Sequence, residues 1–204
     1  MRIIPLLIIV LSSVSFGQKS PYEDDIRTLA AASKVENNNY ANLHAGFRIH
    51  LPQPPCDPIV TMGAFRGPGS AALLRCAHKV TGWKGMYTFD IFADTWAKYP
   101  TLTTIEQYVR GLRSLAEHDP KHPTELDPDI KIIQPETSRK WVGLDFEEMI
   151  VSHHIPEGTY YQGVSCARIK AYALCFSAEA PTVELVRALL VLDGKLEIIS
   201  AQKM

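Results

Sequence analysis

The residues from Ala171 to Leu192 constrain the fold more than any other part of this sequence. Residues 171–176 (AYALCF) have strand character, and Pro181 is typical of the first residue of a helix. The helix predicted to follow, Val183 to Leu192, carries too many apolar residues to face water. Because such a helix needs a second layer to cover it, we expect the rest of the chain to supply a sheet on which it lies.

The first 17 residues have the pattern of a cleavable secretory signal. They combine a positive start at Arg2, an apolar core of about nine residues from Ile3 to Leu11, and small residues at Ser15 and Gly17. A short membrane anchor is the alternative, but a bilayer span needs roughly 20 apolar residues. We therefore expect cleavage after Gly17, a secreted or periplasmic mature chain, and no integral membrane segment after cleavage.

The length and charge of the chain narrow its class and its partners. Removing 17 of the 204 residues leaves enough chain for one well-buried core. We expect a polar N-terminal tether over residues 18–42 and a single α/β domain over residues 43–204. The formal net charge is -1 and no run of Lys or Arg stands out, so nucleic acid is not an expected partner. The expected partner is a protein or a small-molecule ligand of unknown identity.

Four cysteines, Cys56, Cys76, Cys166 and Cys175, would lie in a compartment where disulfides persist. They allow three pairings. A reversal at residues 67–69 (GPG) brings Cys76 back alongside the start of its hairpin, which favours Cys56 as its partner. We predict Cys166 with Cys175 as the second pair. Unpaired buried thiols are the alternative.

Alternating apolar residues predict a chain made mostly of strands. The expected strands are residues 45–51, 59–65, 70–78, 86–96, 130–133, 140–150, 160–167, 171–177 and 196–199. One amphipathic helix is expected after a capping box of Thr103 and Glu106. Its predicted apolar face consists of Ile105, Tyr108, Val109, Leu112, Leu115 and Ala116. Residues 118–128 read as an exposed loop, and Gly194 as the left-handed end of the last helix.

Both ends of the predicted domain resemble PsbP-like domains, the superfamily of extrinsic photosystem II subunits with a Mog-type fold. Residues 39–42 (NYAN) leading into 46–52 (GFRIHLP) look like the entry of such domains, and residues 171–198 are similar to their closing strand, helix and strand. The Trp common after the first strand is replaced here by residues 55–57 (PCD). The resemblance covers roughly residues 40–200. It implies an α/β (α+β) fold, a mainly antiparallel sheet sandwiched between helices, in exported accessory or binding proteins with no shared catalytic residues.

Four histidines are the candidates for a metal site. His153 and His154 are adjacent, and only a loop would let both rings reach one ion, which Pro156 and Gly158 favour. His118 and His122 are four residues apart, but His118 is expected to end a helix, so helical spacing does not bring the pair together. A zinc or copper site is one interpretation, and solvated histidines are the other.

Other reactive groups give weaker patterns. Cys76 and His78 share one face of a strand, as a thiol and its base would, and Asp145 and Glu147 share another beside Glu148. None of the usual hydrolase, metalloprotease or phosphate-loop motifs occurs. We therefore expect no catalytic residues and no cofactor.

Aromatic residues at strand ends and in loops suggest a ligand groove. The candidates are Trp83, Trp96, Tyr99, Trp141, Tyr160 and Tyr161, with Tyr87 beside them, and core packing is the alternative for each. The sequence as a whole predicts an exported, non-catalytic binding or accessory protein of the cell envelope or secreted space. A secreted metal-dependent or hydrolytic enzyme and a carrier of a small apolar ligand are the alternatives.

Overall fold

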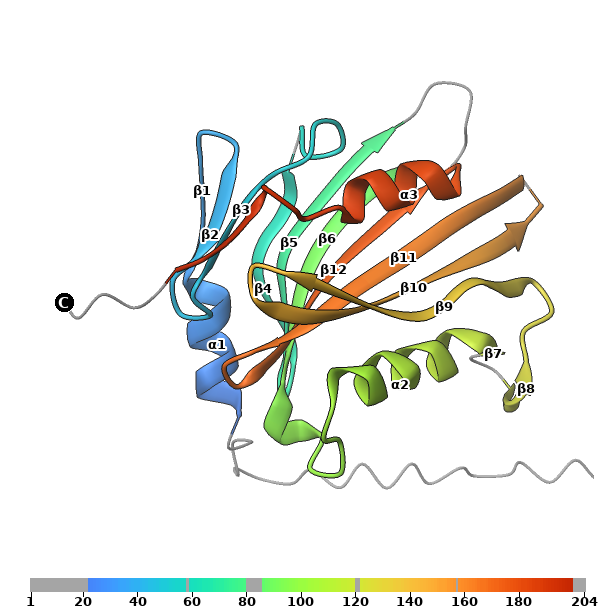
Figure 1. Ribbon diagram of the computed structural model, residues 1–204, viewed down its shortest axis with the longest axis horizontal. Helices are drawn as coiled ribbons and strands as arrows, with labels where there is room; N and C mark the ends of the chain where they lie inside the picture. The colour runs from blue at the N-terminus through green and yellow to red at the C-terminus, as the bar shows by residue number, and fades with distance from the viewer. Residues whose placement is uncertain (1–21, 58, 80–85, 120–121, 157, 200–204) are drawn as a thin grey trace, which may run out of the picture.

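The computed structural model describes residues 22–57, 59–79, 86–119, 122–156 and 158–199 (Figure 1). The predicted signal peptide lies outside these residues. The helices are α1 (Glu23–Ala31), the 3-10 helix η1 (Trp96–Lys98), α2 (Ile105–Glu117) and α3 (Val183–Leu190). The first strands are β1 (Ser33–Glu36), β2 (Asn39–Asn42), β3 (Phe47–His50), β4 (Ile59–Gly67), β5 (Ser70–Lys79) and β6 (Met86–Thr95). The later strands are β7 (His118–Asp119), β8 (His122–Leu126), β9 (Ile130–Trp141), β10 (Leu144–Ile155), β11 (Gly158–Ile169), β12 (Tyr172–Ala180) and β13 (Leu196–Ile198).

A seven-stranded antiparallel sheet forms the centre of the molecule, with the order β4-β5-β6-β12-β11-β10-β9. Strands β9 to β12 follow one another through short turns, as a meander does. The fold is therefore a mixed α/β arrangement built on a mainly antiparallel sheet, as the sequence predicts. One turn was misplaced: residues 142 and 143 both have positive φ, 45° and 81°, and separate β9 from β10 inside the strand predicted over residues 140–150. Valine rarely adopts such a φ, so the sequence did not indicate this turn.

A smaller antiparallel sheet, β1-β2-β3-β13, packs beside the large one and joins the last strand of the chain to the first three (Figure 1). Strand β3 has the predicted alternation: Phe47 and Ile49 are buried, and Arg48 and His50 are exposed. Strand β13 pairs with β3, so residues 196–198 lie against residues 47–49. Two segments almost 150 residues apart in sequence thus share one ladder.

Helix α3 lies on β11 and β12, which confirms the prediction that this apolar helix covers a sheet (Figure 1). Its residues Val186, Leu189 and Leu190 are buried, while Leu185 at its outer side is 39% exposed. Thr182 caps the helix through its side-chain oxygen, so Pro181 precedes the cap instead of starting the helix. Gly194 has the predicted positive φ of 67°, but it lies in a turn after the helix has ended.

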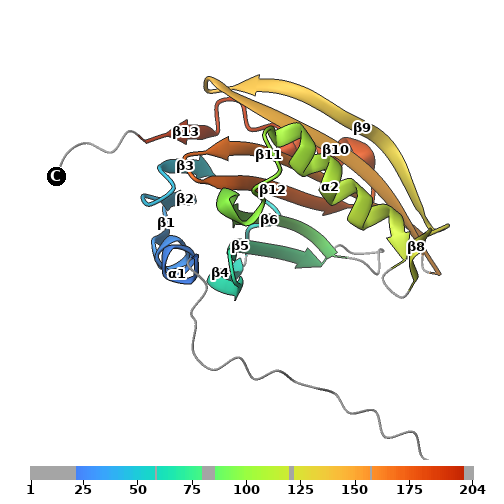
Figure 2. The same cartoon turned by 90° about the horizontal axis from the view of Figure 1, so that it is seen from below.

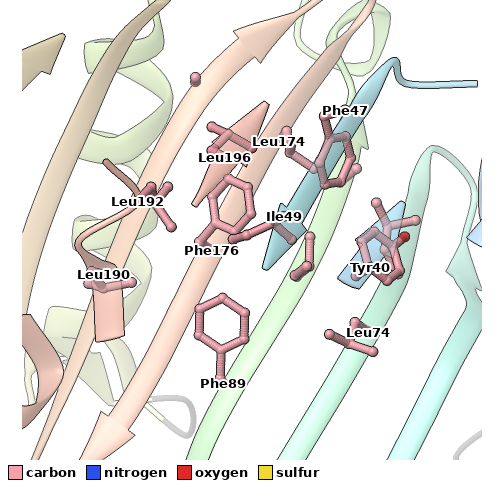
Figure 3. Packing of buried hydrophobic residues seen from close by; sticks show 14 of the residues in the cluster. Tyr40, Phe47, Ile49, Leu74, Phe89, Leu174, Phe176, Leu190, Leu192 and Leu196 are labelled. Carbon is pink, nitrogen blue, oxygen red and sulfur yellow. The ribbon is translucent and has the colours of Figure 1, made fainter. Parts of the chain in front are cut away.

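The main core lies between the large sheet, the small sheet, α1 and α3. Figure 3 shows Phe176 and Phe89 of the large sheet facing Ile49 and Phe47 of the small sheet, with Leu196 of β13 beside them. The rings of Phe47 and Phe176 meet edge to face, with centroids 6.1 Å apart. These side chains are fully buried, so this core accounts for a large part of the hydrophobic stabilisation.

Helix α2 covers the opposite face of the large sheet, across β9, β10 and β11 (Figure 2). Its capping box begins one residue later than predicted, because Thr104 accepts from the Gln107 amide and the Gln107 side chain accepts from the Thr104 amide. Tyr108 and Val109 are buried as expected, but Leu115 is 78% exposed, so that part of the predicted apolar face is wrong. No helix among the described residues has the length and apolar content to cross a membrane.

Residues 22–42 do not form the predicted polar tether. They form α1, β1 and β2, and Ile26, Leu29 and Tyr40 are fully buried in the main core. Asn42 is also fully buried, where its amide donates to the Leu29 carbonyl at 2.7 Å. The segment was predicted to be a tether because it contains few apolar residues. Those few residues are spaced so that they fall on the inner side of a helix and of a short strand. The loop predicted over residues 118–128 likewise contains a small hairpin of β7 and β8.

Both predicted disulfides are present. Cys56 pairs with Cys76 across the base of the β4–β5 hairpin, with Cα atoms 4.7 Å apart. Cys166 of β11 and Cys175 of β12 are direct cross-strand partners beneath α2, with Cα atoms 4.1 Å apart. Because Cys76 is oxidised, the thiol and base pair that its spacing to His78 suggested does not exist in this structure.

Candidate ligand-binding site

A cavity of about 170 Å³ lies between α2 and the large sheet. Helix α2 lies across the sheet on this side of the molecule (Figure 2). Most of its walls are apolar side chains, with polar groups from β11 and β12. The lining residues are Phe92, Leu112, Ala116, Met149, Val151, Gln162, Gly163, Val164 and Ser177.

The alternation of the strands explains why these side chains meet. Met149 of β10 is the direct cross-strand partner of Val164 on β11, and Val151 is the partner of Gln162. Direct partners in a ladder point to the same face of the sheet. Helix α2 closes the cavity with Leu112 and the small side chain of Ala116, one turn apart on its inner side.

Two carboxylates border the cavity beyond its apolar walls. Asp90 of β6 is the direct partner of Ser177, and Glu179 of β12 is the direct partner of Gln162. Ser177 and Gln162 both line the cavity. Asp90 also lies two residues before Phe92 on the same strand face, which corresponds to about 7 Å along the strand. The two acids therefore lie next to the cavity on its own face of the sheet.

Asp90 is unusual because it is charged, largely buried and poorly paired. Its side chain is 16% exposed, and its Oδ1 is shielded from water and has no hydrogen-bond partner in the part of the chain that the structure describes. The Nε of Arg75, the nearest cation, is 3.8 Å from that oxygen, too far for a hydrogen bond. Burial raises the pKa of Asp90 to about 6; Arg75 and Arg66 oppose this, and Glu179 adds to it.

Glu179 ends a chain of polar groups that crosses the sheet. The Nε2 of His153 donates to the side-chain oxygen of Gln162 at 3.1 Å, and the Gln162 amide donates to Glu179 at 3.3 Å. The His153 ring stacks on Tyr160, with centroids 4.6 Å apart. Burial raises the pKa of Glu179 and lowers that of His153, so His153 favours its neutral form. This arrangement fixes the amide of Gln162 at the wall of the cavity.

A partly buried carboxylate also holds the helix that closes the cavity. Asp94 of β6 accepts hydrogen bonds from Tyr99 at 2.6 Å and from Tyr108 of α2 at 2.9 Å. Burial and the nearby Asp94 charge raise the pKa of both phenols far above their usual value, so both stay protonated donors. Because Tyr108 belongs to α2, these bonds tie the helix to β6.

A second, more open cavity of about 670 Å³ lies near the first residues of α2 and the turn between β9 and β10. It is lined by charges of both signs, which include Asp145, Glu147, Lys140 and Arg168. Asp145 and Glu147 thus share a face as predicted, but Glu147 is only 6% exposed and accepts from the Ser138 hydroxyl. Glu148 points away from this cavity and pairs with Arg139 at 2.9 Å. Because the opposite charges are close to balanced, this cavity favours no ligand charge.

The four candidate metal ligands are spread over separate elements. His118 follows α2 and donates from Nδ1 to the Ser114 carbonyl at 2.5 Å, and the side chain of His122 lies outside the described residues. His153 and His154 lie in β10, where neighbouring residues point to opposite faces, so the predicted loop is wrong. The described residues contain no group of three or more His, Cys, Asp or Glu side chains placed to hold a metal ion. The metal site stays a prediction, which metal analysis of the purified protein and of a variant lacking all four histidines would test.

The predicted aromatic groove is divided between two faces of the sheet. Trp96 and Tyr99 pack in the cluster under α2, whereas Trp141 and Tyr161 belong to the main core. Tyr160 stacks on His153, and Trp83 lies outside the described residues. Tyr160, through its contact with His153, belongs to the polar chain that reaches Gln162 in the cavity wall, and Trp96 and Tyr99 pack in the same cluster as the wall residues Met149 and Val164.

Asp90 and Glu179 were missed as site residues. Each is an acid within a strand whose neighbours are aromatic or apolar, Phe89 and Ile91 for Asp90, and Ala178 and Ala180 for Glu179. An acid at such a position is solvated or serves a purpose in the structure. An acid flanked by apolar residues within a predicted strand was therefore the sequence pattern that could have identified both site residues.

Comparison with known proteins gives a fold-level similarity only. No protein-family model matches the sequence, and no curated protein is significantly similar to it. The solution structure of cyanobacterial PsbP (CyanoP) from Synechocystis sp. PCC 6803 matches 78% of this chain and 91% of its own, with 9% identity and a TM-score of 0.44. A similarity of this size does not indicate a function for this chain.

Proposed function

We propose that this chain is an exported, non-catalytic binding protein and that its ligand site is the cavity between α2 and the large sheet. The observation that carries the proposal is the cavity itself: about 170 Å³, mostly apolar, and closed by a helix anchored to the sheet. Binding sites for small molecules are concave and mostly apolar, with a few fixed polar groups. This cavity has that composition.

The size of the cavity sets the size of the ligand. Engineered apolar cavities of about 150 Å³ stay dry and take up benzene. A cavity of about 170 Å³ is therefore suited to one ring or to a short branched alkyl group. This supports the small apolar-ligand carrier among the functions that the sequence suggests. The role of an accessory to an envelope or secreted assembly is the broader form of the same proposal.

Export is part of the proposal and rests on two features. The first 17 residues have the pattern of a secretory signal, and both disulfides suit an oxidising compartment. The mass of the protein recovered from its native cell compartment tests this directly. A chain that still begins at Met1 and is found in the cytoplasm would contradict it.

Binding of propylbenzene tests the proposed site. We expect this neutral probe to shift the NMR signals of Leu112, Met149 and Val164, all of which line the cavity. The variant Ala116→Leu places a larger side chain in the cavity and should abolish the shifts. The matched control is Ser114→Leu, which introduces the same side chain at an exposed position of the same helix. Shifts that are absent in the natural protein, or unchanged in Ala116→Leu, would refute the proposal.

A further inference from the structure

We propose that the ligand is a small organic cation, with its apolar group in the cavity and its ammonium group between Asp90 and Glu179. The inference rests on the proposed function, because it names the class of ligand for the same site. Its basis is the placement of two poorly paired acids at the border of an apolar cavity.

The register places both acids within reach of a ligand in the cavity. Asp90 lies directly across from Ser177, and Glu179 directly across from Gln162, and both partners line the cavity. Direct partners have Cβ atoms about 5 Å apart, and diagonal neighbours such as Asp90 and Glu179 are about 7–8 Å apart. An ammonium group between the two acids is close enough to hydrogen-bond with either of them. The apolar group attached to it would then lie between Phe92 and α2.

Both carboxylates can accept more hydrogen bonds than the described residues donate to them. Among the described residues, one oxygen of Asp90 is shielded from water without a partner, and Glu179 accepts from the Gln162 amide at the long distance of 3.3 Å. Thr88, the direct partner of Glu179, is 1% exposed and its hydroxyl also has no partner among the described residues. A carboxylate accepts as many as four hydrogen bonds, and buried acceptors without donors are costly. An ammonium ligand supplies three donors at this place.

The charges around the site favour a cation over an anion. Arg75 of β5 lies beside Asp90, but its side chain is 42% exposed, and Arg66 of β4 is also exposed. Their charges are therefore screened by solvent more than those of the two acids. His153, which belongs to the same polar chain as Glu179, favours its neutral form because it is buried. The raised pKa values of Asp90 and Glu179 are consistent with acids whose charge is not fully compensated.

Three probes with the same phenylethyl group and different end-group charge test the inference. They are 2-phenylethylammonium, neutral propylbenzene and the anion 3-phenylpropanoate. Binding is followed by NMR titration at about pH 8, where Asp90 is ionised and the amine is still charged. We expect the cation to bind about tenfold more tightly than propylbenzene, and the anion most weakly, because a hydrogen bond between charged groups is worth about a factor of ten or more.

Two variants locate the ammonium group. Asp90→Asn and Glu179→Gln should each weaken the cation about tenfold and leave propylbenzene binding unchanged. The matched control is Asp145→Asn, because Asp145 is 77% exposed and lines the other cavity. If the three probes bind equally, or if neither variant weakens the cation, the inference is wrong.

The probes also separate this inference from the proposed function. If propylbenzene binds in the cavity but the cation binds no more tightly, only the inference fails. If no probe responds to Ala116→Leu, the proposed site fails as well. Binding of the cation that depends on Asp90 but not on Ala116 would contradict the inference, because the apolar group would then lie outside the cavity.

Discussion

Replacing Gly163 by alanine tests how closely α3 lies on the large sheet. A Cβ atom at Gly163 would lie 2.5 Å from Cγ1 of Val186 and 2.7 Å from Cδ1 of Leu190, both on α3. Carbon atoms prefer separations of about 3.5–4.0 Å, so the helix must move away by about 1 Å or its side chains must leave their preferred rotamers. Overpacking of this kind costs about 1–3 kcal/mol, and the lower entropy of the unfolded alanine chain returns about 0.4–1 kcal/mol. We expect a net loss of about 1–2 kcal/mol in the free energy of unfolding.

Gly111→Ala is the matched control for this change. Gly111 lies inside α2, and a Cβ atom there would meet nothing within 4 Å. Alanine is favoured over glycine in a helix by about 0.5–1 kcal/mol, so this variant should be more stable than the natural protein. Urea denaturation of both variants measures the two free energies on one scale. The same chemical change should give opposite signs at the two sites.

The result that would refute the reasoning is a Gly163→Ala variant as stable as the natural protein or more so. A double variant adds a second check. Val186→Ala removes the closest atom, so the double variant should lose less stability than the sum of the two single variants, by about 0.5 kcal/mol or more. Strict additivity would mean that α3 does not contact Gly163 as described.

Two further predictions concern buried polar groups. Asn42→Ala should lower the free energy of unfolding by about 2 kcal/mol or more in urea denaturation, because the Leu29 carbonyl and the Ala45 amide each lose a partner inside the protein; a loss below about 0.5 kcal/mol would contradict it. Asp90→Asn should change the pH dependence of stability: the folded state raises the pKa of Asp90 from 3.8 to about 6, so the natural protein binds this proton more tightly when folded and loses stability as the pH rises from about 4 through 6. A pKa shift of about two units corresponds to at most about 3 kcal/mol, so the variant should gain in stability relative to the natural protein as the pH rises from 4 to 8. Urea denaturation at several pH values measures the free energy of unfolding of both proteins. A constant difference between the two free energies over this range would show that the effect is absent.

The sequence predicted the elements whose burial follows from composition. Residues 183–190 are apolar on nearly every side, and the structure places them on the sheet. The hairpin of β4 and β5 was predicted from the glycines at its turn, and the position of Cys76 on it then identified Cys56 as its partner. In both cases a local property, hydrophobicity or turn chemistry, is enough to determine the structure.

The N-terminal segment shows where composition misleads. Residues 22–42 contain many polar residues, yet Ile26, Leu29 and Tyr40 are fully buried. Most of these polar side chains are exposed, while Asn42 is buried and bonds to the backbone of α1. A count of polar residues cannot separate a solvated tether from a thin layer whose inner side is apolar. The spacing of Ile26 and Leu29 on one helical face was the informative feature.

The cavity was beyond prediction for a different reason. Its walls come from β6, β10, β11, β12 and α2, and each strand by itself shows only ordinary alternation. What creates the space is the combination of small side chains, Ala116 on the helix and Ser177 on β12, at places that the register and the helix position bring together. Register depends on bulges such as the one between Glu148 and Val151, where one slip would exchange the faces of every following residue. A single sequence does not specify where such a bulge occurs, and so it does not specify the register of the two strands.

One face of the large sheet packs against α3 and the other forms the cavity under α2, and Gly163 contributes to both. Its missing side chain makes room for α3 on one face, while its backbone lines the cavity under α2 on the other. Because successive residues of a strand point to opposite faces, a methyl group added there points toward α3 and leaves the cavity volume unchanged. If stability and ligand binding are independent properties of the two faces, Gly163→Ala lowers the first without changing the second. If binding falls as well, β11 transmits the displacement of α3, and the cavity depends on the same packing that holds the C-terminal helix in place.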